Sequence, residues 1–279
     1  MPSIPFLNKL PWRKKGPVIP AVRLHGVIGD AGRFRQGLTI ANTAGLLHKA
    51  FSMPGPAVAI LINSPGGSPA QSDLIGRRIR ALAEEKKKTV YAFTEDVAAS
   101  GGYWLAVAAD EIYALETSLV GSIGVVSGGF GLAGLIKKLG VERRLHTAGE
   151  AKARLDPFSP EKPEDVEWLT DLQEKMHDIF KETVKTRRGD RLKAPQETAF
   201  SGDVWLGRPA LEMGLIDGIG DVKGVMTEKF GKDVRLKLIE ARTGMLNRLL
   251  GRTQSPAQDW ADGLLDAIEA RAMWGRFGL

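Results

Sequence analysis

The chain contains no cysteine and only four histidines among its 279 residues. The lack of cysteine excludes disulfide bonds, cysteine-bound zinc and thiol catalysis, and it fits a reducing compartment. No group of histidine, aspartate and glutamate residues has the spacing of a metal site, and no glycine-rich segment matches a Walker phosphate-binding loop. We therefore expect neither a metal nor a cofactor.

The chain also lacks a long apolar segment near its start. The uncharged stretches before Asp30 are far shorter than the roughly 18 apolar residues that a spanning helix needs, and prolines interrupt them. We therefore expect no signal peptide and no transmembrane helix, and a cytoplasmic protein. Residues 1–16 are basic with interleaved apolar side chains, so this tail could contact an anionic membrane surface peripherally. A disordered basic tail is the alternative.

The composition is that of a folded enzyme rather than a nucleic-acid-binding protein. Hydrophobic residues make up 43% of the chain and charged residues 26%, and the length suffices for one large α/β domain. The net charge is +6, but most basic residues are dispersed among acidic ones along helical faces. We therefore expect no nucleic-acid partner.

Ser100 lies in a run of small residues, Ala-Ala-Ser-Gly-Gly, at positions 98–102. An apolar β-like run (90–93) precedes it and a helix-like run (103–109) follows. This pattern predicts a strand, a tight turn and a helix, with the hydroxyl at the N-terminus of the helix. Free backbone N–H groups there favour a developing negative charge, as a serine nucleophile requires. The alternative is a turn of small residues packed closely against a neighbouring element.

A second glycine turn has the same setting. Residues 57–62 read as a buried strand, Asn-Ser-Pro-Gly-Gly follows at 63–67, and residues 71–83 have a helical pattern. Parallel packing of two such units brings their turns to one edge of a sheet. The N–H groups of Gly67 and Gly101 could then converge on a single oxyanion. Taken alone, such a turn is more often structural than catalytic.

Three motifs in register carry a resemblance to a known family. They are Asn-Ser-Pro-Gly-Gly at 63–67, Asp-Val-Ala-Ala-Ser-Gly-Gly-Tyr-Trp at 96–104 and Gly-Ser-Ile-Gly-Val at 121–125. In this order and spacing they resemble the signal peptide peptidase A (SppA) family of serine proteases. The resemblance implies a Clp/crotonase-like α/β fold of repeated ββα units, with Ser100 as the nucleophile and the N–H groups of Gly67 and Gly101 as oxyanion donors.

No histidine has the setting of a general base. Each reads as a surface or hydrogen-bonded residue, at the end of a strand-like run or on a helix: His25, His48, His146 and His177. The resemblance implies a lysine base instead, because burial of the amine in an apolar pocket favours its neutral form.

In the family that lysine follows the serine by roughly fifty residues, after a strand and a glycine turn. Residues 141–147 read as the strand and Gly149 as the turn, which makes Lys152 the implied base. The alternatives are a solvated lysine in an exposed loop and Lys162, a poor substitute near the start of the next helix. The resemblance implies that the Ser122 hydroxyl orients the lysine amine. The alternative is that Ser122 is an ordinary turn serine.

The expected organisation is a basic tail (1–16), a peptidase domain (17–240) and an amphipathic, helical C-terminal tail (241–279). The C-terminal tail could dock on a partner subunit, a membrane or the domain itself. Inside the domain, Ser159 and Pro160 have the pattern of a helix start, and residues 234–239 that of a last strand.

The resemblance implies a homo-oligomeric ring in which Ser100 of one subunit faces Lys152 of its neighbour. The expected activity is endopeptidase cleavage of signal-peptide-like or other unfolded peptides through an acyl-enzyme. One alternative is a crotonase-like acyl-CoA enzyme with Glu95 or Asp96 as its acid/base, and another is a non-catalytic scaffold that binds peptides or membrane.

Overall fold

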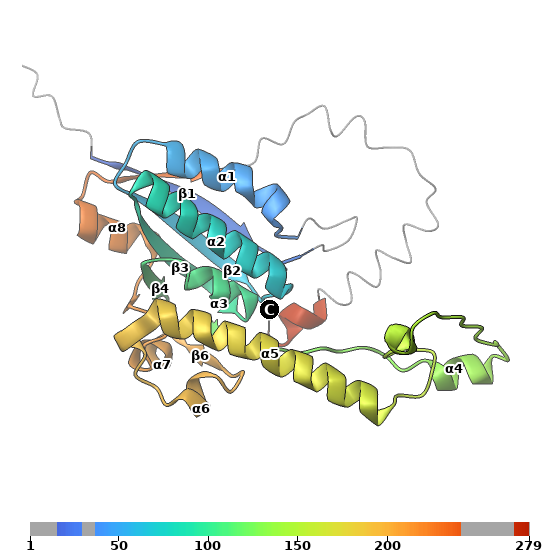
Figure 1. Ribbon diagram of the computed structural model, residues 1–279. Coiled ribbons are helices and arrows are strands. Elements are labelled where there is room, and N and C mark those ends of the chain that lie inside the picture. Colours follow the sequence, from blue (N-terminus) through green and yellow to red (C-terminus); the bar gives the residue numbers. More distant parts are fainter. Residues whose placement is uncertain (1–15, 30–36, 241–270, 279) are drawn as a thin grey trace, which may run out of the picture.

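The computed structural model describes residues 16–29, 37–240 and 271–278. Its centre is an eight-stranded sheet with the order β6-β5-β3-β2-β1-β8, in which β4 pairs with β3 and with β7 (Figure 1). All pairs are parallel except β5 with β6. The strands are β1 Val18–His25, β2 Ala57–Ser64, β3 Thr89–Ala99, β4 Glu111–Ala114, β5 Leu119–Gly121, β6 Val204–Leu206, β7 Gly218–Ile219 and β8 Arg235–Ile239.

Helices connect these strands and cover both faces of the sheet. The α-helices are α1 Ile40–Ser52, α2 Pro69–Lys86, α3 Gly101–Ala106, α4 Ala133–Lys138, α5 Pro163–Arg188, α6 Gln196–Ala199, α7 Gly207–Glu212 and α8 Val222–Phe230. Two short 3-10 helices are η1 Glu150–Ala153 and η2 Gly189–Arg191. The first three strands are each followed by one helix, so the repeated ββα unit expected from the sequence is not confirmed.

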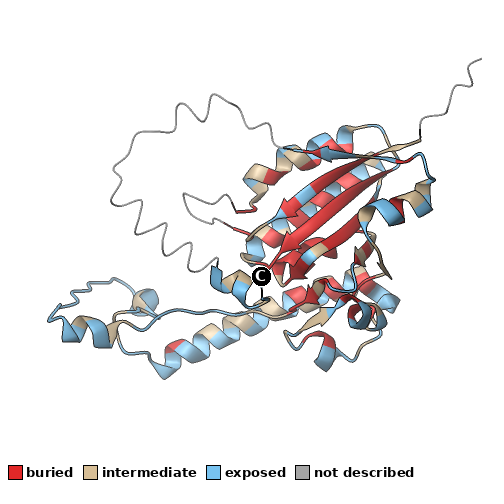
Figure 2. Cartoon of the chain, turned by 180° about the vertical axis from the view of Figure 1, so that it is seen from behind, coloured by how far each residue is buried: buried red, intermediate tan, exposed pale blue. Residues whose placement is uncertain are grey.

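Alternation along β1 explains why the sheet has two apolar faces. Val22 and Leu24 join a core cluster that includes apolar side chains of α1, α2, α3 and α5. Ile19 and Ala21, one position out of phase, join a smaller cluster with side chains of α8. Every residue of β2 is buried, as expected of a central parallel strand (Figure 2). The predicted α/β class is therefore confirmed.

Several predicted elements are present with wider bounds. The strand predicted at 57–62 runs to Ser64, the run at 90–93 lies within an 11-residue β3, and the helix predicted at 71–83 lies within α2. The last predicted strand corresponds to β8. Ser68 begins α2 by accepting a hydrogen bond from the Gln71 N–H, and a proline occupies the first turn.

Two local predictions were wrong. Residues 141–147 form no strand: they have no sheet partner, and Val141 and Leu145 are exposed. The long helix α5 begins at Pro163, with Lys162 as its N-cap residue, and not at Ser159. The Ser159 hydroxyl donates to the Asp156 carboxylate instead of capping the helix.

Residues 124–162 leave the end of β5, extend away from the sheet and return to the start of α5 (Figure 1). We call this segment the arm. Most of it is exposed (Figure 2). The exposed residues include large apolar ones: Val126, Phe130, Leu135, Leu139, Val141, Leu145 and Leu155. In a single chain these large apolar side chains therefore remain exposed to solvent.

The predicted tails lie almost wholly outside the described residues. Of the amphipathic tail at 241–279, the structure describes residues 271–278, where the Trp274 ring stacks on His25 with 5.7 Å between ring centroids. Of the basic tail, only Gly16 is described. Within the described ranges, no helix combines the length and the apolar character needed to cross a membrane.

A buried ion pair ties the C-terminal end of α5 to the segment before β7. Two guanidinium nitrogens of Arg188, which is 2% exposed, donate to the Asp217 carboxylate at 2.8 and 3.0 Å. The Ile112 N–H donates to the same carboxylate at 2.7 Å. Burial alone would raise the pKa of Asp217, but these hydrogen bonds and the Arg188 charge outweigh it and lower the pKa.

This shift predicts an acid-sensitive contribution to stability. The folded pKa of Asp217 lies below the unfolded value of about 3.9, so the contribution is complete above that pH. It disappears as the pH falls through the folded pKa. Urea unfolding of the wild type and Asp217→Asn should therefore show a difference in free energy of unfolding that is larger at pH 6 than at pH 3. An equal difference at both pH values would contradict this assignment.

Candidate active site

Ser100 occupies a strained turn between β3 and α3. Its backbone has φ 52° and ψ −120°, a conformation that glycine adopts readily and other residues rarely. The Ser100 N–H donates to the Gly121 carbonyl at 2.8 Å, and its carbonyl accepts from the Trp104 N–H at 3.0 Å. Ser100 is partly exposed, while the nine residues that follow it, 101–109, are buried. The turn thus presents the hydroxyl at the surface, at the start of a helix, as the sequence predicted.

The glycine turn after β2 packs directly against the Ser100 turn. A Cβ atom on Gly66 would lie 2.8 Å from Ser100 Cβ and 2.9 Å from the Gly101 nitrogen. A Cβ atom on Gly102 would lie 2.4 Å from the Ser64 carbonyl oxygen. Such contacts are too short for a side chain, so the two turns can approach this closely only with glycine at these positions.

The backbone nitrogen of Gly67 lies close to Gly101. The position of a Cβ atom on Gly101 is 3.4 Å from the Gly67 nitrogen. Ile28 holds the other side of the turn, because its N–H donates to Gly66 O and its carbonyl accepts from Ser68 N. In the described part of the chain, neither Gly67 N–H nor Gly101 N–H has a protein acceptor. Two unused donors next to a surface hydroxyl can stabilise an oxyanion.

Ser122 lies next to the carbonyl that holds Ser100. It follows Gly121, is 8% exposed and has a positive φ of 50°. Its N–H donates to the Asp203 carbonyl at 2.6 Å. The structure therefore brings four predicted site residues together at the carboxyl ends of β2, β3 and β5: Ser100, Gly67, Gly101 and Ser122.

Sequence reasoning missed one contact at this loop. The His177 Nε2 atom on α5 lies 2.9 Å from the Ile123 carbonyl oxygen. Because a carbonyl only accepts, Nε2 must carry the proton and donate. The sequence pattern places His177 on a helix, and nothing in the 53 residues between Ile123 and His177 indicates this contact.

Lys152 does not join the other predicted residues within one chain. It lies in η1, on the arm, and its side chain is exposed. The alternative lysine, Lys162, is the N-cap residue of α5 and is also exposed. A single copy of the chain thus holds the hydroxyl and the two N–H donors, and carries its candidate lysine on the arm.

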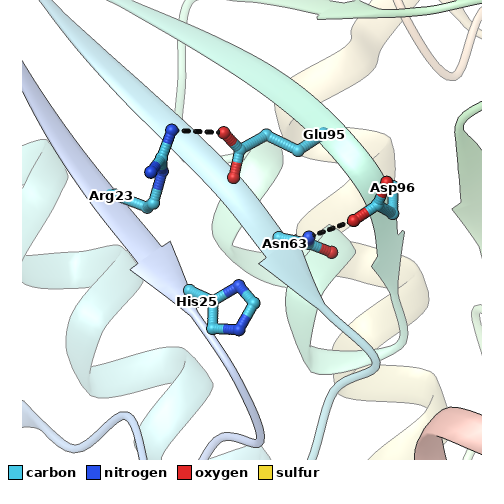
Figure 3. A pocket seen from close by; sticks show the side chains of 5 residues that line it. All are labelled: Arg23, His25, Asn63, Glu95 and Asp96. Atoms are coloured by element: carbon cyan, nitrogen blue, oxygen red, sulfur yellow. Dashed lines mark hydrogen bonds and ion pairs between the residues drawn. The ribbon is translucent and has the colours of Figure 1, made fainter. Parts of the chain in front are cut away.

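A shallow pocket of about 590 Å³ lies on the sheet face that α8 partly covers (Figure 3). It is lined by Arg23, His25, Asn63, Glu95 and Asp96. Glu95 pairs with Arg23 at 2.8 Å, and Asp96 accepts a hydrogen bond from Asn63 (Figure 3). The two carboxylates of the acyl-CoA alternative are thus engaged here. Within the described ranges, no cluster of three or more histidine, aspartate and glutamate residues could hold a metal.

Comparison with known proteins gives the family. A Brucella abortus protein named Na(+)/H(+) antiporter NhaA is 52% identical over 272 residues, which are 94% of this chain and 37% of that protein. The chloroplastic serine protease SPPA of Arabidopsis thaliana is 39% identical over 165 residues, 59% of this chain and 24% of that protein. Protease 4 of Haemophilus influenzae is 32% identical over 225 residues, 77% of this chain and 35% of that protein.

The chain thus spans between 24% and 37% of the length of these three relatives. Most of the Brucella protein lies outside its match, so its name is a statement about that whole protein. Residues 82–235 match the model of Peptidase family S49. That match covers more than half of the chain and includes the Ser100 turn, β5 and the arm. The chain belongs to peptidase family S49.

Proposed function

We propose that this chain is a serine endopeptidase with Ser100 as its nucleophile and a Clp/crotonase-like core. The observation that carries the proposal is the strained Ser100 turn, with the unused N–H groups of Gly67 and Gly101 beside it. Strain of this kind persists where the surrounding structure fixes it, and it is common at active sites. The membership in a peptidase family supplies the reaction class.

The proposed reaction is acyl transfer. The Ser100 Oγ atom attacks the peptide carbonyl carbon while its proton passes to a neutral lysine amine. The carbonyl oxygen becomes an oxyanion, which accepts hydrogen bonds from Gly67 N–H and Gly101 N–H. The C–N bond then breaks, and the lysine returns its proton to the leaving amine. Water, deprotonated by the same lysine, hydrolyses the acyl-enzyme and frees the Ser100 hydroxyl.

We propose that the lysine is Lys152 of a neighbouring copy. The arm extends away from its own Ser100 and exposes large apolar residues, among them Val126, Phe130 and Leu139 (Figure 2). A second copy of the chain would bury these side chains and bring the amine to a foreign Ser100. Burial in that interface would also remove water from the amine and favour its neutral form.

The shared site predicts complementation. Ser100→Ala and Lys152→Ala proteins should each be inactive, and a mixture that exchanges subunits should recover activity, because the first supplies the lysine and the second the serine. The measurement is hydrolysis of an unfolded, dye-quenched protein before and after mixing. Two batches of Ser100→Ala protein mixed with each other are the control. A mixture that stays inactive after subunit exchange has been demonstrated would contradict the shared site.

The substrate we propose is an extended, signal-peptide-like or otherwise unfolded peptide. Residues 125–131, directly after the Ser122 loop, have neither helix nor sheet structure and are mostly exposed. Such backbone can pair with an extended peptide through main-chain hydrogen bonds, which gives little sequence preference. Small or apolar side chains next to the cleaved bond fit the small-residue surroundings of Ser100.

A further inference from the structure

Helix α5 touches both halves of the candidate site. Near its middle, His177 donates to the Ile123 carbonyl, one residue beyond Ser122. In its first turn, Asp165 contacts the segment directly after η1, which carries Lys152. These two side chains are about 18 Å apart along a helix that rises 1.5 Å per residue. Figure 1 shows α5 running from beneath the sheet out to the arm.

The contact at Asp165 is built from several groups. Its carboxylate accepts the Leu155 N–H at 3.3 Å and lies 3.4 Å from Arg154 Nε. The Arg154 guanidinium also lies over the Trp168 ring of α5, 5.0 Å from its centroid. Asp165 is 8% exposed, and a carboxylate in the first turn of a helix is favoured by the helix dipole. Arg154, two residues after Lys152, is therefore held against α5 in two ways. Its own side chain contacts Asp165 and Trp168, and the N–H of the next residue, Leu155, donates to Asp165.

The contact at His177 holds the loop after β5, which carries Ser122. Two backbone hydrogen bonds also hold this loop: the Ser100 N–H donates to the Gly121 carbonyl, and the Ser122 N–H donates to the Asp203 carbonyl. His177 adds a side-chain donor from α5. Ser122 has a positive φ, which surrounding contacts must maintain.

We infer that α5 positions both parts of the catalytic site. Asp165 is the positioning residue for Lys152, and His177 is the positioning residue for the Ser122 loop. The inference rests on the proposed function. Asp165 acts through Arg154 and Leu155 on the arm that reaches into a neighbouring site. His177 acts within its own chain on the loop beside its own Ser100. The two residues therefore affect different partners of one shared site.

The mixed assembly separates these roles. In a mixture of Ser100→Ala and Lys152→Ala chains, every active site takes its lysine from the first chain and its serine from the second. Asp165→Ala placed on the lysine-donating chain should lower kcat of the mixture about tenfold, because a misplaced catalytic group slows reaction steeply. Placed on the serine-donating chain, whose residue 152 is alanine, it should leave kcat within about twofold. His177→Ala should show the reverse dependence.

Matched variants exclude a loss of folding. Asp171→Ala removes an exposed carboxylate of the same helix, which pairs with Lys175 and with no other cation among the described residues, and it should change kcat from neither chain. Asp165→Asn keeps an acceptor for the Leu155 N–H and should recover part of the rate, while KM stays unchanged throughout. Thermal unfolding and the size of the assembly are measured for every mixture.

Each outcome decides the inference. If Asp165→Ala has an equal effect from both chains and complementation is intact, the positioning role of α5 is wrong while the proposed function stands. If the unmodified mixture is inactive, the shared site is wrong, and the uniform Asp165→Ala enzyme then decides: a kcat within twofold of the wild type overturns the positioning role. A tenfold lower kcat, with KM unchanged and partial recovery by Asp165→Asn, supports it.

Discussion

Ser100→Ala protein should hydrolyse unfolded protein substrate at least about 10⁴ times more slowly than the wild type. Removal of the nucleophile eliminates the acyl-enzyme route, and losses of about 10⁴- to 10⁶-fold are typical of other serine hydrolases. Labelling by a fluorophosphonate probe should disappear with activity, because the probe reacts with the same oxygen. The measurements are initial rates with a dye-quenched substrate and mass spectrometry of the labelled peptide.

The fold should survive the change. Alanine keeps the Cβ atom and the N–H bond to Gly121, so the free energy of unfolding should differ from the wild type by less than about 1 kcal/mol. Ser52→Ala, at an exposed position of α1, is the control and should retain full activity. Hydrolysis by Ser100→Ala at an undiminished rate would show that another group performs the reaction.

Arg188→Met should be the most destabilising single change that we predict. It removes both hydrogen bonds that Arg188 donates to Asp217, together with the bond from Arg188 Nε to the Gly214 carbonyl. The Asp217 side chain, which is 14% exposed, then keeps Arg191, itself 42% exposed, as its one cationic partner in the described part of the chain. Breaking one side of a buried pair costs about 3–5 kcal/mol. Urea or thermal unfolding measures the loss.

A surface ion pair gives the matched control. Arg208 pairs with Glu116, and both side chains are more than half exposed. Arg208→Met should change the free energy of unfolding by no more than about 1 kcal/mol, because solvent screens the pair. Equal effects of the two substitutions would mean that burial of the Arg188 pair contributes nothing to stability.

The sequence was most informative where local chemistry decides structure. The apolar run at 57–62 indicated a buried strand, which the structure confirms, and the glycines at 66 and 67 form a turn that side chains cannot enter. The same reasoning placed Ser100 at a helix start. These features depend on residues close in sequence, and backbone sterics alone restricts their conformations.

Other features depend on contacts across the chain, which a single sequence does not reveal. Residues 141–147 have a strand-like composition, but a strand needs a neighbouring edge, and the arm lies away from the sheet. Ser159 has the chemistry of an N-cap, yet its hydroxyl donates a hydrogen bond to Asp156 instead. The sequence gives no signal of the Arg188 ion pair, because its partner lies 29 residues further on. His177 was missed for the same reason.

The backbone at Ser100 limits which residues this position can accommodate. Glycine fits its positive φ without strain, whereas any other residue there costs about 1–3 kcal/mol. Ser100→Gly should therefore give a protein that resists unfolding better than its parent and cleaves nothing. A laboratory evolution experiment that rewards thermal resistance alone should thus converge on glycine at position 100, and one that also rewards cleavage should keep the serine.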